Sequence, residues 1–120
     1  MLASLHSPRF ARLASLTPPP HPPQTAKVQE NLISLVYKKC EENGVFLEGT
    51  LLKASMTVSG VDCPNKAKPE EIAKMTVQTL QRCVPVSVPG VVFLSGGISE
   101  EDASIYLNEI NKKERKVRRA

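Results

Sequence analysis

A lysine and a small-residue turn, each next to an apolar run, are the residues of this chain best suited to chemistry. The first run, residues 46–53, is strand-like and ends in Lys53. The second run, residues 91–94, opens into Ser95-Gly96-Gly97. A lysine amine can attack a carbonyl carbon and form a covalent intermediate, and small residues let backbone N–H groups approach a phosphate. The sequence therefore predicts a lysine and a phosphate cradle on neighbouring strands.

Both segments also have a purely structural interpretation. A lysine at a strand end is usually solvated or ion-paired, and Ser95-Gly96-Gly97 also fits an ordinary strand-to-helix turn. Ser99, followed by Asp102 three residues later, resembles a capping box at a helix start. Glu100 and Glu101 would repel a phosphate placed directly on that helix end. The residues alone leave both interpretations open.

Three helices and two strands are expected to position these residues. Apolar residues at helical spacing predict a helix from about Thr25, and Gly44 supplies its C-terminal stop. The continuous run 45–53 is typical of a parallel strand buried on both faces. Pro69 begins a second helix, and a third starts near Glu100. With the second apolar run as a strand, the predicted order is helix, strand, helix, strand, helix.

Each predicted helix has one apolar stripe, which we expect to face the core. The stripe positions are Val28, Leu32, Leu35, Val36 and Cys40 in the first helix, Ile72, Met75, Thr79, Leu80 and Cys83 in the second, and Ala103, Tyr106, Leu107 and Ile110 in the third.

Composition predicts a small soluble domain. The 120 residues are 41% hydrophobic and 23% charged, and no apolar run approaches the roughly 18 residues of a membrane span. The three cysteines, Cys40, Cys63 and Cys83, are widely spaced and form no C-x-x-C pair, which argues against a disulfide framework and a zinc site. A reducing compartment fits best, and we expect a cytoplasmic location.

The two ends of the chain differ from its middle. Residues 1–29 carry three basic residues and no acid, and residues 112–120 carry six basic residues and one acid, so the middle is net −4 although the whole chain is +4. We expect a disordered proline-rich leader over 1–24, a folded region over 25–111 and a basic tail over 112–120. The leader is either an organelle transit peptide, which would indicate a plastid, or an unstructured extension.

Two motifs closely resemble class I fructose-bisphosphate aldolase. They are Leu47-Glu48-Gly49-Thr50-Leu51-Leu52-Lys53 and Val92-Phe93-Leu94-Ser95-Gly96-Gly97, within a resemblance that runs from about residue 28 to residue 112. The resemblance implies an α/β fold of the (β/α)8 TIM-barrel type, which needs about 250 residues. We therefore expect a fragment of that barrel with about two strands and three helices.

The resemblance also implies an activity. It is the reversible cleavage of fructose 1,6-bisphosphate to dihydroxyacetone phosphate and glyceraldehyde 3-phosphate, in glycolysis and gluconeogenesis. Lys53 matches the Schiff-base lysine, and Ser95, Gly96 and Gly97 match the substrate-phosphate segment. The family implies a sugar phosphate substrate and a tetramer for the complete enzyme, with no metal or other cofactor. We expect neither a membrane nor a nucleic acid as a partner.

The chain departs from the family pattern in ways that bear on activity. Residues 54–60 read Ala-Ser-Met-Thr-Val-Ser-Gly where the family normally has Pro-x-Met-Val-Thr-Pro-Gly, and Ile98 replaces the usual glutamine. The family's upstream aspartate, second lysine, proton-handling glutamates and downstream arginine have no counterpart. We therefore expect this chain alone to be weakly active or inactive. The alternatives are an inactive truncated fragment with open strand edges and a non-catalytic binding piece whose basic tail docks on an acidic partner or a nucleic acid.

Overall fold

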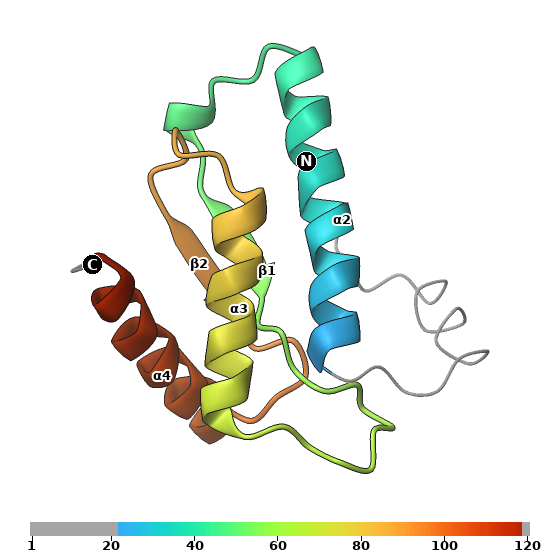
Figure 1. Cartoon of the computed structure of the whole chain (residues 1–120). Coiled ribbons are helices and arrows are strands. Elements are labelled where there is room, and N and C mark those ends of the chain that lie inside the picture. The colour runs from blue at the N-terminus through green and yellow to red at the C-terminus, as the bar shows by residue number, and fades with distance from the viewer. Residues whose placement is uncertain (1–21, 119–120) are drawn as a thin grey trace.

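A computed structural model describes residues 22–118, and the side chains of residues 22–114. The predicted leader therefore lies outside the described residues up to position 21. The elements are α2 (Pro22–Glu42), the 3-10 turn η1 (Leu47–Gly49), β1 (Leu52–Ser55), α3 (Pro69–Cys83), β2 (Val91–Leu94) and α4 (Glu100–Arg118). The described chain is an α/β unit of three helices and two parallel strands (Figure 1), which confirms the expected fold class.

The two strands form a parallel sheet whose register places the predicted site segments together. Lys53 of β1 lies opposite Val92 of β2, and Ser55 lies opposite Leu94. Parallel strands need a crossover connection, and α3 provides it. Because both strands run in the same direction, the chain leaves them at the same edge of the sheet.

The helices form a second layer with α3 in the middle. α3 packs against both α2 and α4 and lies over one face of the sheet (Figure 1). The core lies between α3, α4 and the strands. Its buried members are Met56, Ile72, Ala73, Val77 and Ile110, and Val58, Ala67, Phe93, Ile98 and Tyr106 pack around them.

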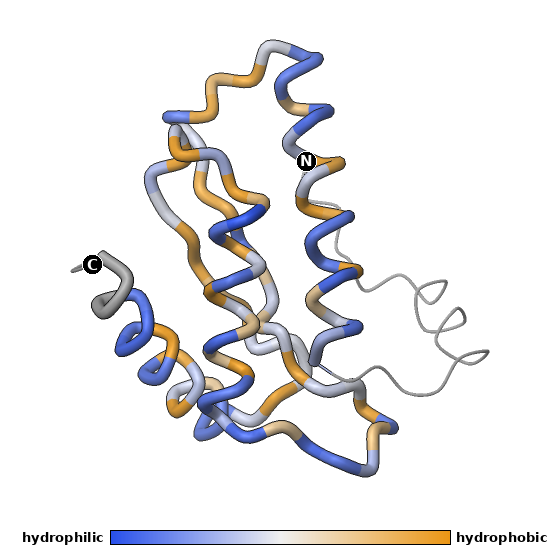
Figure 2. The backbone as a smooth tube through the Cα atoms, in the orientation of Figure 1, coloured by the Kyte–Doolittle hydropathy of each residue, from blue (hydrophilic) through white to orange (hydrophobic). Residues whose placement is uncertain are grey.

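The prediction that the whole stripe of α2 faces the core is wrong. Val28, Leu35 and Val36 are 53%, 54% and 46% exposed, and α2 instead buries Ala26 and Tyr37. Hydrophobic positions recur along α2 (Figure 2), and these three are exposed. The cause is the narrow sheet. Two strands lie about 4.8 Å apart, so the sheet is about as wide as one helix of about 10 Å diameter and cannot cover the apolar faces of three helices.

The same one-sided packing affects the other two helices. On α3, Ile72 and Thr79 are buried as predicted, whereas Met75 and Cys83 are only half-buried. On α4, Ile110 is buried but Leu107 is 41% exposed, contrary to the prediction. α3 is thus the best-covered helix because it alone has a helical neighbour on both sides.

Two predicted helix ends, the C-terminus of α2 at Gly44 and the N-terminus of α4 at Ser99, are confirmed by their hydrogen bonds. Gly44 has φ +64°, and the N–H groups of Gly44 and Val45 donate to the carbonyls of Glu41 and Cys40, which is a Schellman motif. At the start of α4, the Ser99 Oγ accepts from the Asp102 N–H at 3.1 Å. The first helix begins at Pro22, three residues earlier than expected, since proline is compatible with a first helical turn.

The first predicted strand is shorter than expected and starts later. In the segment before β1, the N–H and the Oγ1 of Thr50 both donate to the Leu47 carbonyl, at 3.0 and 2.7 Å. These local bonds close a 3-10 turn over Leu47–Gly49 where the sequence predicted extended backbone. Lys53 is consequently the second residue of a strand that ends at Ser55, and not its last residue.

The last helix continues through the predicted boundary at Lys112 and ends at Arg118. The basic segment therefore begins as part of α4. Among the described residues, no helix is long and apolar enough to cross a membrane.

A buried hydroxyl connects the end of β1 to α3. The Thr57 N–H, just after β1, donates to the Thr76 Oγ1 at 2.9 Å, and this hydroxyl donates to the Ile72 carbonyl at 2.7 Å. Thr57 and Thr76 are each 1% exposed. Thr79, one turn along α3, is equally buried, but its Oγ1 has no hydrogen-bond partner in the described structure.

Thr76→Val and Thr79→Val form a matched pair that tests this connection. We expect Thr76→Val to lower the free energy of unfolding by about 1–3 kcal/mol, because it leaves the buried Thr57 N–H unsatisfied. Thr79→Val removes a hydroxyl that has already lost its hydrogen bonds to water, so we expect no loss or a small gain. Urea unfolding followed by circular dichroism measures both, and equal losses in the two variants would contradict the assigned role of Thr76.

Candidate active site

Lys53 lies on the face of the sheet opposite α3 and α4. The exposure along β1 alternates, with Leu52 and Ala54 half-buried and Lys53 and Ser55 exposed. Since side chains alternate along a strand, Lys53 and Ser55 point to the same face. Val92, opposite Lys53 on β2, is 44% exposed on that face. The lysine therefore stands on an open apolar surface.

The turn after β2 has the conformation that its glycines permit. The Ile98 N–H donates to the Ser95 carbonyl at 3.1 Å, and the two central residues, Gly96 and Gly97, have φ of +58° and +89°. Positive φ at both central positions is typical of a type I′ turn, which glycine adopts without steric cost. The N–H groups of Gly96 and Gly97 donate to no acceptor in the described part of the chain. Both remain available to an anion.

The turn and the end of β1 line a common pocket of about 220 Å³. Its lining residues come from α2, from the β1 end and its following loop, and from the turn after β2: Thr25, Gln29, Ser55, Met56, Val58, Ser59, Gly60, Val61, Ser95, Gly96 and Ile98. A Cβ on Gly96 would lie 3.7 Å from the Ser55 Cβ, so the two segments touch. The structure therefore brings Ser95 and Gly96 into one pocket, whereas Lys53 and Gly97 do not line it.

Lys53 is nevertheless a neighbour of this pocket. It precedes Ser55 by two residues on the same strand face, a separation of about 7 Å between Cα atoms. A fully extended lysine side chain covers a similar distance. The pocket and the amine can thus contact two ends of one small molecule.

The loop after β1 forms one wall of the pocket and is held by hydrogen bonds. The Lys66 Nζ donates to the carbonyls of Gly60 and Val61, at 2.8 Å each. The Ser59 Oγ accepts from the Ala67 N–H at 3.0 Å. These bonds constrain the loop around Ser59, one of the two positions where the family pattern has a proline; the other, Ala54, lies within β1.

Sequence reasoning missed three residues at this site. Gln29 of α2 donates through its Nε2 to the carbonyl and the Oγ of Ser55, at 3.3 and 3.1 Å, and its Oε1 accepts from the Thr57 Oγ1 at 2.6 Å. The alternation along β1 would have identified Ser55 if the strand had been extended by two residues. Gln29 gives no such signal, because its contact with Ser55 spans 26 positions in the sequence.

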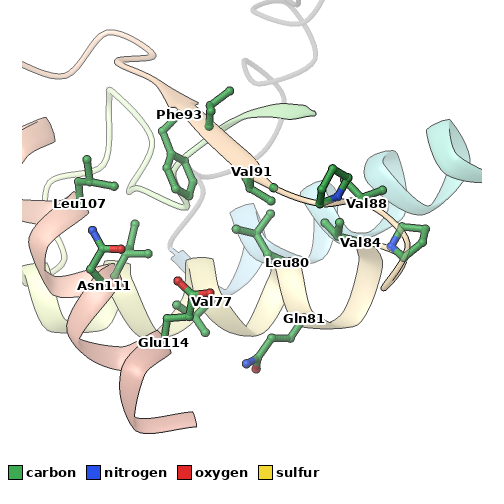
Figure 3. A pocket seen from close by; sticks show the side chains of 15 residues that line it. Val77, Leu80, Gln81, Val84, Val88, Val91, Phe93, Leu107, Asn111 and Glu114 are labelled. Carbon is green, nitrogen blue, oxygen red and sulfur yellow. The ribbon is translucent and has the colours of Figure 1, made fainter. Parts of the chain in front are cut away.

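A larger hollow of about 720 Å³ lies elsewhere, between α3, α4 and β2 (Figure 3). Leu80, Val91, Phe93 and Leu107 are among its apolar lining residues. It lies on the helix side of the sheet, whereas Lys53 points to the other side. We interpret it as unfilled core next to the free edge of β2, since its lining is mostly apolar and its polar side chains, Gln81, Asn111 and Glu114, all come from the helices.

Neither the shifted pKa values nor the metal-binding side chains indicate a second site in the described residues. Burial raises the pKa of the Tyr37 phenol, with a smaller contribution from Cys40, and burial followed by Asp102 raises the pKa of Tyr106. Neither tyrosine lines the small pocket. No group of three or more His, Cys, Asp or Glu side chains that could hold a metal ion occurs in the described part of the chain.

Comparison with known proteins identifies the family. The family model described as "Fructose-bisphosphate aldolase class-I" matches residues 21–119. The chain is 55% identical over 86 residues to fructose-bisphosphate aldolase 2 of Plasmodium berghei, which covers 72% of this chain and 23% of that protein. It is 55% identical over 85 residues to fructose-bisphosphate aldolase C of Mus musculus, covering 71% of this chain and 23% of the relative.

A solved structure agrees with these matches. Fructose-bisphosphate aldolase from Plasmodium falciparum, crystallised in complex with TRAP and a small molecule inhibitor, superposes with a TM-score of 0.76 at 48% identity and covers 78% of this chain and 27% of that one. The chain spans about a quarter of the length of the relatives that it matches. Sequence and structure agree that the chain belongs to the class I fructose-bisphosphate aldolase family.

Proposed function

We propose that this chain carries the Schiff-base and phosphate-binding part of a fructose-bisphosphate aldolase site. Lys53 would attack the ketone carbon of dihydroxyacetone phosphate or of the bisphosphate sugar, with loss of water, to form an iminium. The iminium withdraws electrons and stabilises the carbanion left by carbon–carbon cleavage. Ser95, Gly96 and Gly97 would bind one phosphate group. For the complete enzyme, the reaction is the reversible aldol cleavage of glycolysis.

One observation carries this proposal. The parallel register puts Lys53 opposite Val92, and Val92 precedes Ser95 by three residues. Lys53 and the glycine turn therefore both lie near the carboxyl end of the sheet. Active sites of β/α barrels gather at the carboxyl ends of the strands. Without this register, the two motifs would be separate features of the sequence.

Turnover requires groups beyond this pocket. None of the described residues that line it is acidic or basic, so none of these is suited to move protons during cleavage. General acid–base catalysis typically contributes about 10² to 10⁴ in rate. Lys53 is also exposed, so the described part of the chain does not exclude water from the amine. We therefore propose that the isolated chain forms the covalent adduct slowly and releases products very slowly.

Reductive trapping tests the proposed role of Lys53. Dihydroxyacetone phosphate is added with borohydride, which transfers hydride to the iminium carbon and leaves a stable secondary amine. We expect one adduct by intact mass, mapped to Lys53, and none at that position in Lys53→Arg, since a guanidinium does not form the iminium.

The matched control is Lys74→Arg, which changes an exposed lysine on α3 outside the site. We expect this variant to be trapped as well as the original chain. Labelling spread evenly over surface lysines, or adduct formation that survives Lys53→Arg, would mean that the chain is an aldolase only by descent.

Gly96→Ala tests the phosphate turn against a conformational control. Gly44 has nearly the same left-handed φ as Gly96, +64° against +58°, and lies outside the pocket. Forcing an L-residue into this region costs about 1–2 kcal/mol, so we expect both Gly→Ala variants to lose similar stability in thermal unfolding. Only Gly96→Ala should also lower the trapping of dihydroxyacetone phosphate per folded molecule. If Gly44→Ala lowers trapping equally, the turn has no specific part in binding.

A further inference from the structure

Ser55 is a pocket residue that the family motifs do not assign. It is the last residue of β1, its side chain is exposed, and it lines the 220 Å³ pocket together with Ser95 and Gly96. Its Cβ would be 3.7 Å from a Cβ on Gly96. Ser55 is thus at the phosphate-turn end of the pocket, two residues beyond Lys53 on the same strand face.

The surrounding hydrogen bonds fix the orientation of the Gln29 amide. A backbone carbonyl can only accept, so the Gln29 group 3.3 Å from the Ser55 carbonyl must be the Nε2. The Oε1 then faces Thr57, whose hydroxyl donates to it at 2.6 Å. Thr57 is itself anchored, because its N–H donates to the buried Thr76. The amide is therefore held between a strand carbonyl and a buried threonine.

This orientation determines what the Ser55 hydroxyl can do. The same Nε2 donates to the Ser55 Oγ at 3.1 Å, so the serine oxygen is an acceptor in that contact. A hydroxyl has one proton to donate, and no acceptor in the described part of the chain receives it. The proton is therefore available to a bound ligand, and an anionic oxygen is the acceptor that a hydroxyl binds best.

From this arrangement we propose that Ser55 donates a hydrogen bond to the substrate phosphate and that Gln29 is the positioning residue that keeps its hydroxyl a donor. The inference rests on the proposed function and adds a contact to the phosphate site. The described residues that line the pocket include no cation. The donors that they offer to an anion are neutral, namely the N–H of Gly96 and the hydroxyls of Ser95 and Ser55.

Four variants test the contact. Ser55→Ala removes the donor, and Ser55→Thr keeps a hydroxyl. Gln29→Glu replaces the amide nitrogen by a second acceptor, which competes for the serine proton and adds negative charge. Ser104→Ala is the matched control, because it removes an exposed hydroxyl on α4 that donates to the Glu100 carbonyl away from the pocket.

The readout compares two ketones that differ only in the phosphate. Each variant of the full chain is trapped with borohydride over a range of dihydroxyacetone phosphate and, separately, of dihydroxyacetone. We expect Ser55→Ala and Gln29→Glu to raise the half-maximal concentration of the phosphate ester about tenfold or more, the usual effect of one hydrogen bond to a charged group. Trapping of dihydroxyacetone should stay within about twofold, Ser55→Thr should recover much of the loss, and Ser104→Ala should change neither.

A second measurement separates this inference from the Schiff-base proposal. Inorganic phosphate is titrated into the ¹⁵N-labelled chain while the amide signals of Gly96 and Gly97 are followed. If phosphate shifts these signals more weakly in Ser55→Ala, the contact holds even when Lys53 traps no ketone. If Lys53 is trapped but Ser55→Ala lowers both ketones equally or neither, or if phosphate shifts no signal in the turn, the contact is overturned.

Discussion

The parallel pairing of β1 with β2 is the constraint on which the rest of the molecule depends. It aligns Lys53 with Val92 and Ser55 with Leu94, so that the chain leaves both strands at one edge. Parallel pairing in turn requires the crossover, and the amphipathic α3 provides it. Since the crossover must pack back onto the sheet, its buried residues form the centre of the core. The candidate site and the core are consequences of the same pairing.

The sheet is covered by helices on only one face, which explains both the well-packed core and the exposure of Lys53. α3 and α4 cover one face of the sheet, and α3 is well packed between its two helical neighbours. The other face, with Lys53 and Val92, is open. In a closed barrel this face would be the interior, which is filled by layers of side chains from all strands. Two strands can present the Lys53 amine but do not enclose it, so they do not exclude water from it.

Hydrogen bonds near the end of β1 restrain the backbone, which prolines would stiffen in the family pattern. The pocket wall after β1 is tied down by Lys66 and Ser59. The end of β1 is held by Gln29 from one side and by the buried Thr57–Thr76 pair from the other. These contacts join α2, β1 and α3 at the pocket, so a short strand keeps a defined end without prolines beside it.

The sequence by itself determined the order of helices and strands, three of the helix ends and the family. Gly44, Ser99 and Pro69 act through local backbone geometry, and the two motifs around Lys53 and Ser95 are contiguous in the chain, so these features could be predicted without a fold. The tertiary structure decided what depends on distant partners. The local bonds of Thr50 shortened the first strand, the narrow sheet left Val28 and Leu35 exposed, and the pairing of Gln29 with Ser55 joined residues 26 positions apart. Periodicity shows that a helix face is apolar, but only the width of the sheet beneath it decides whether that face is covered.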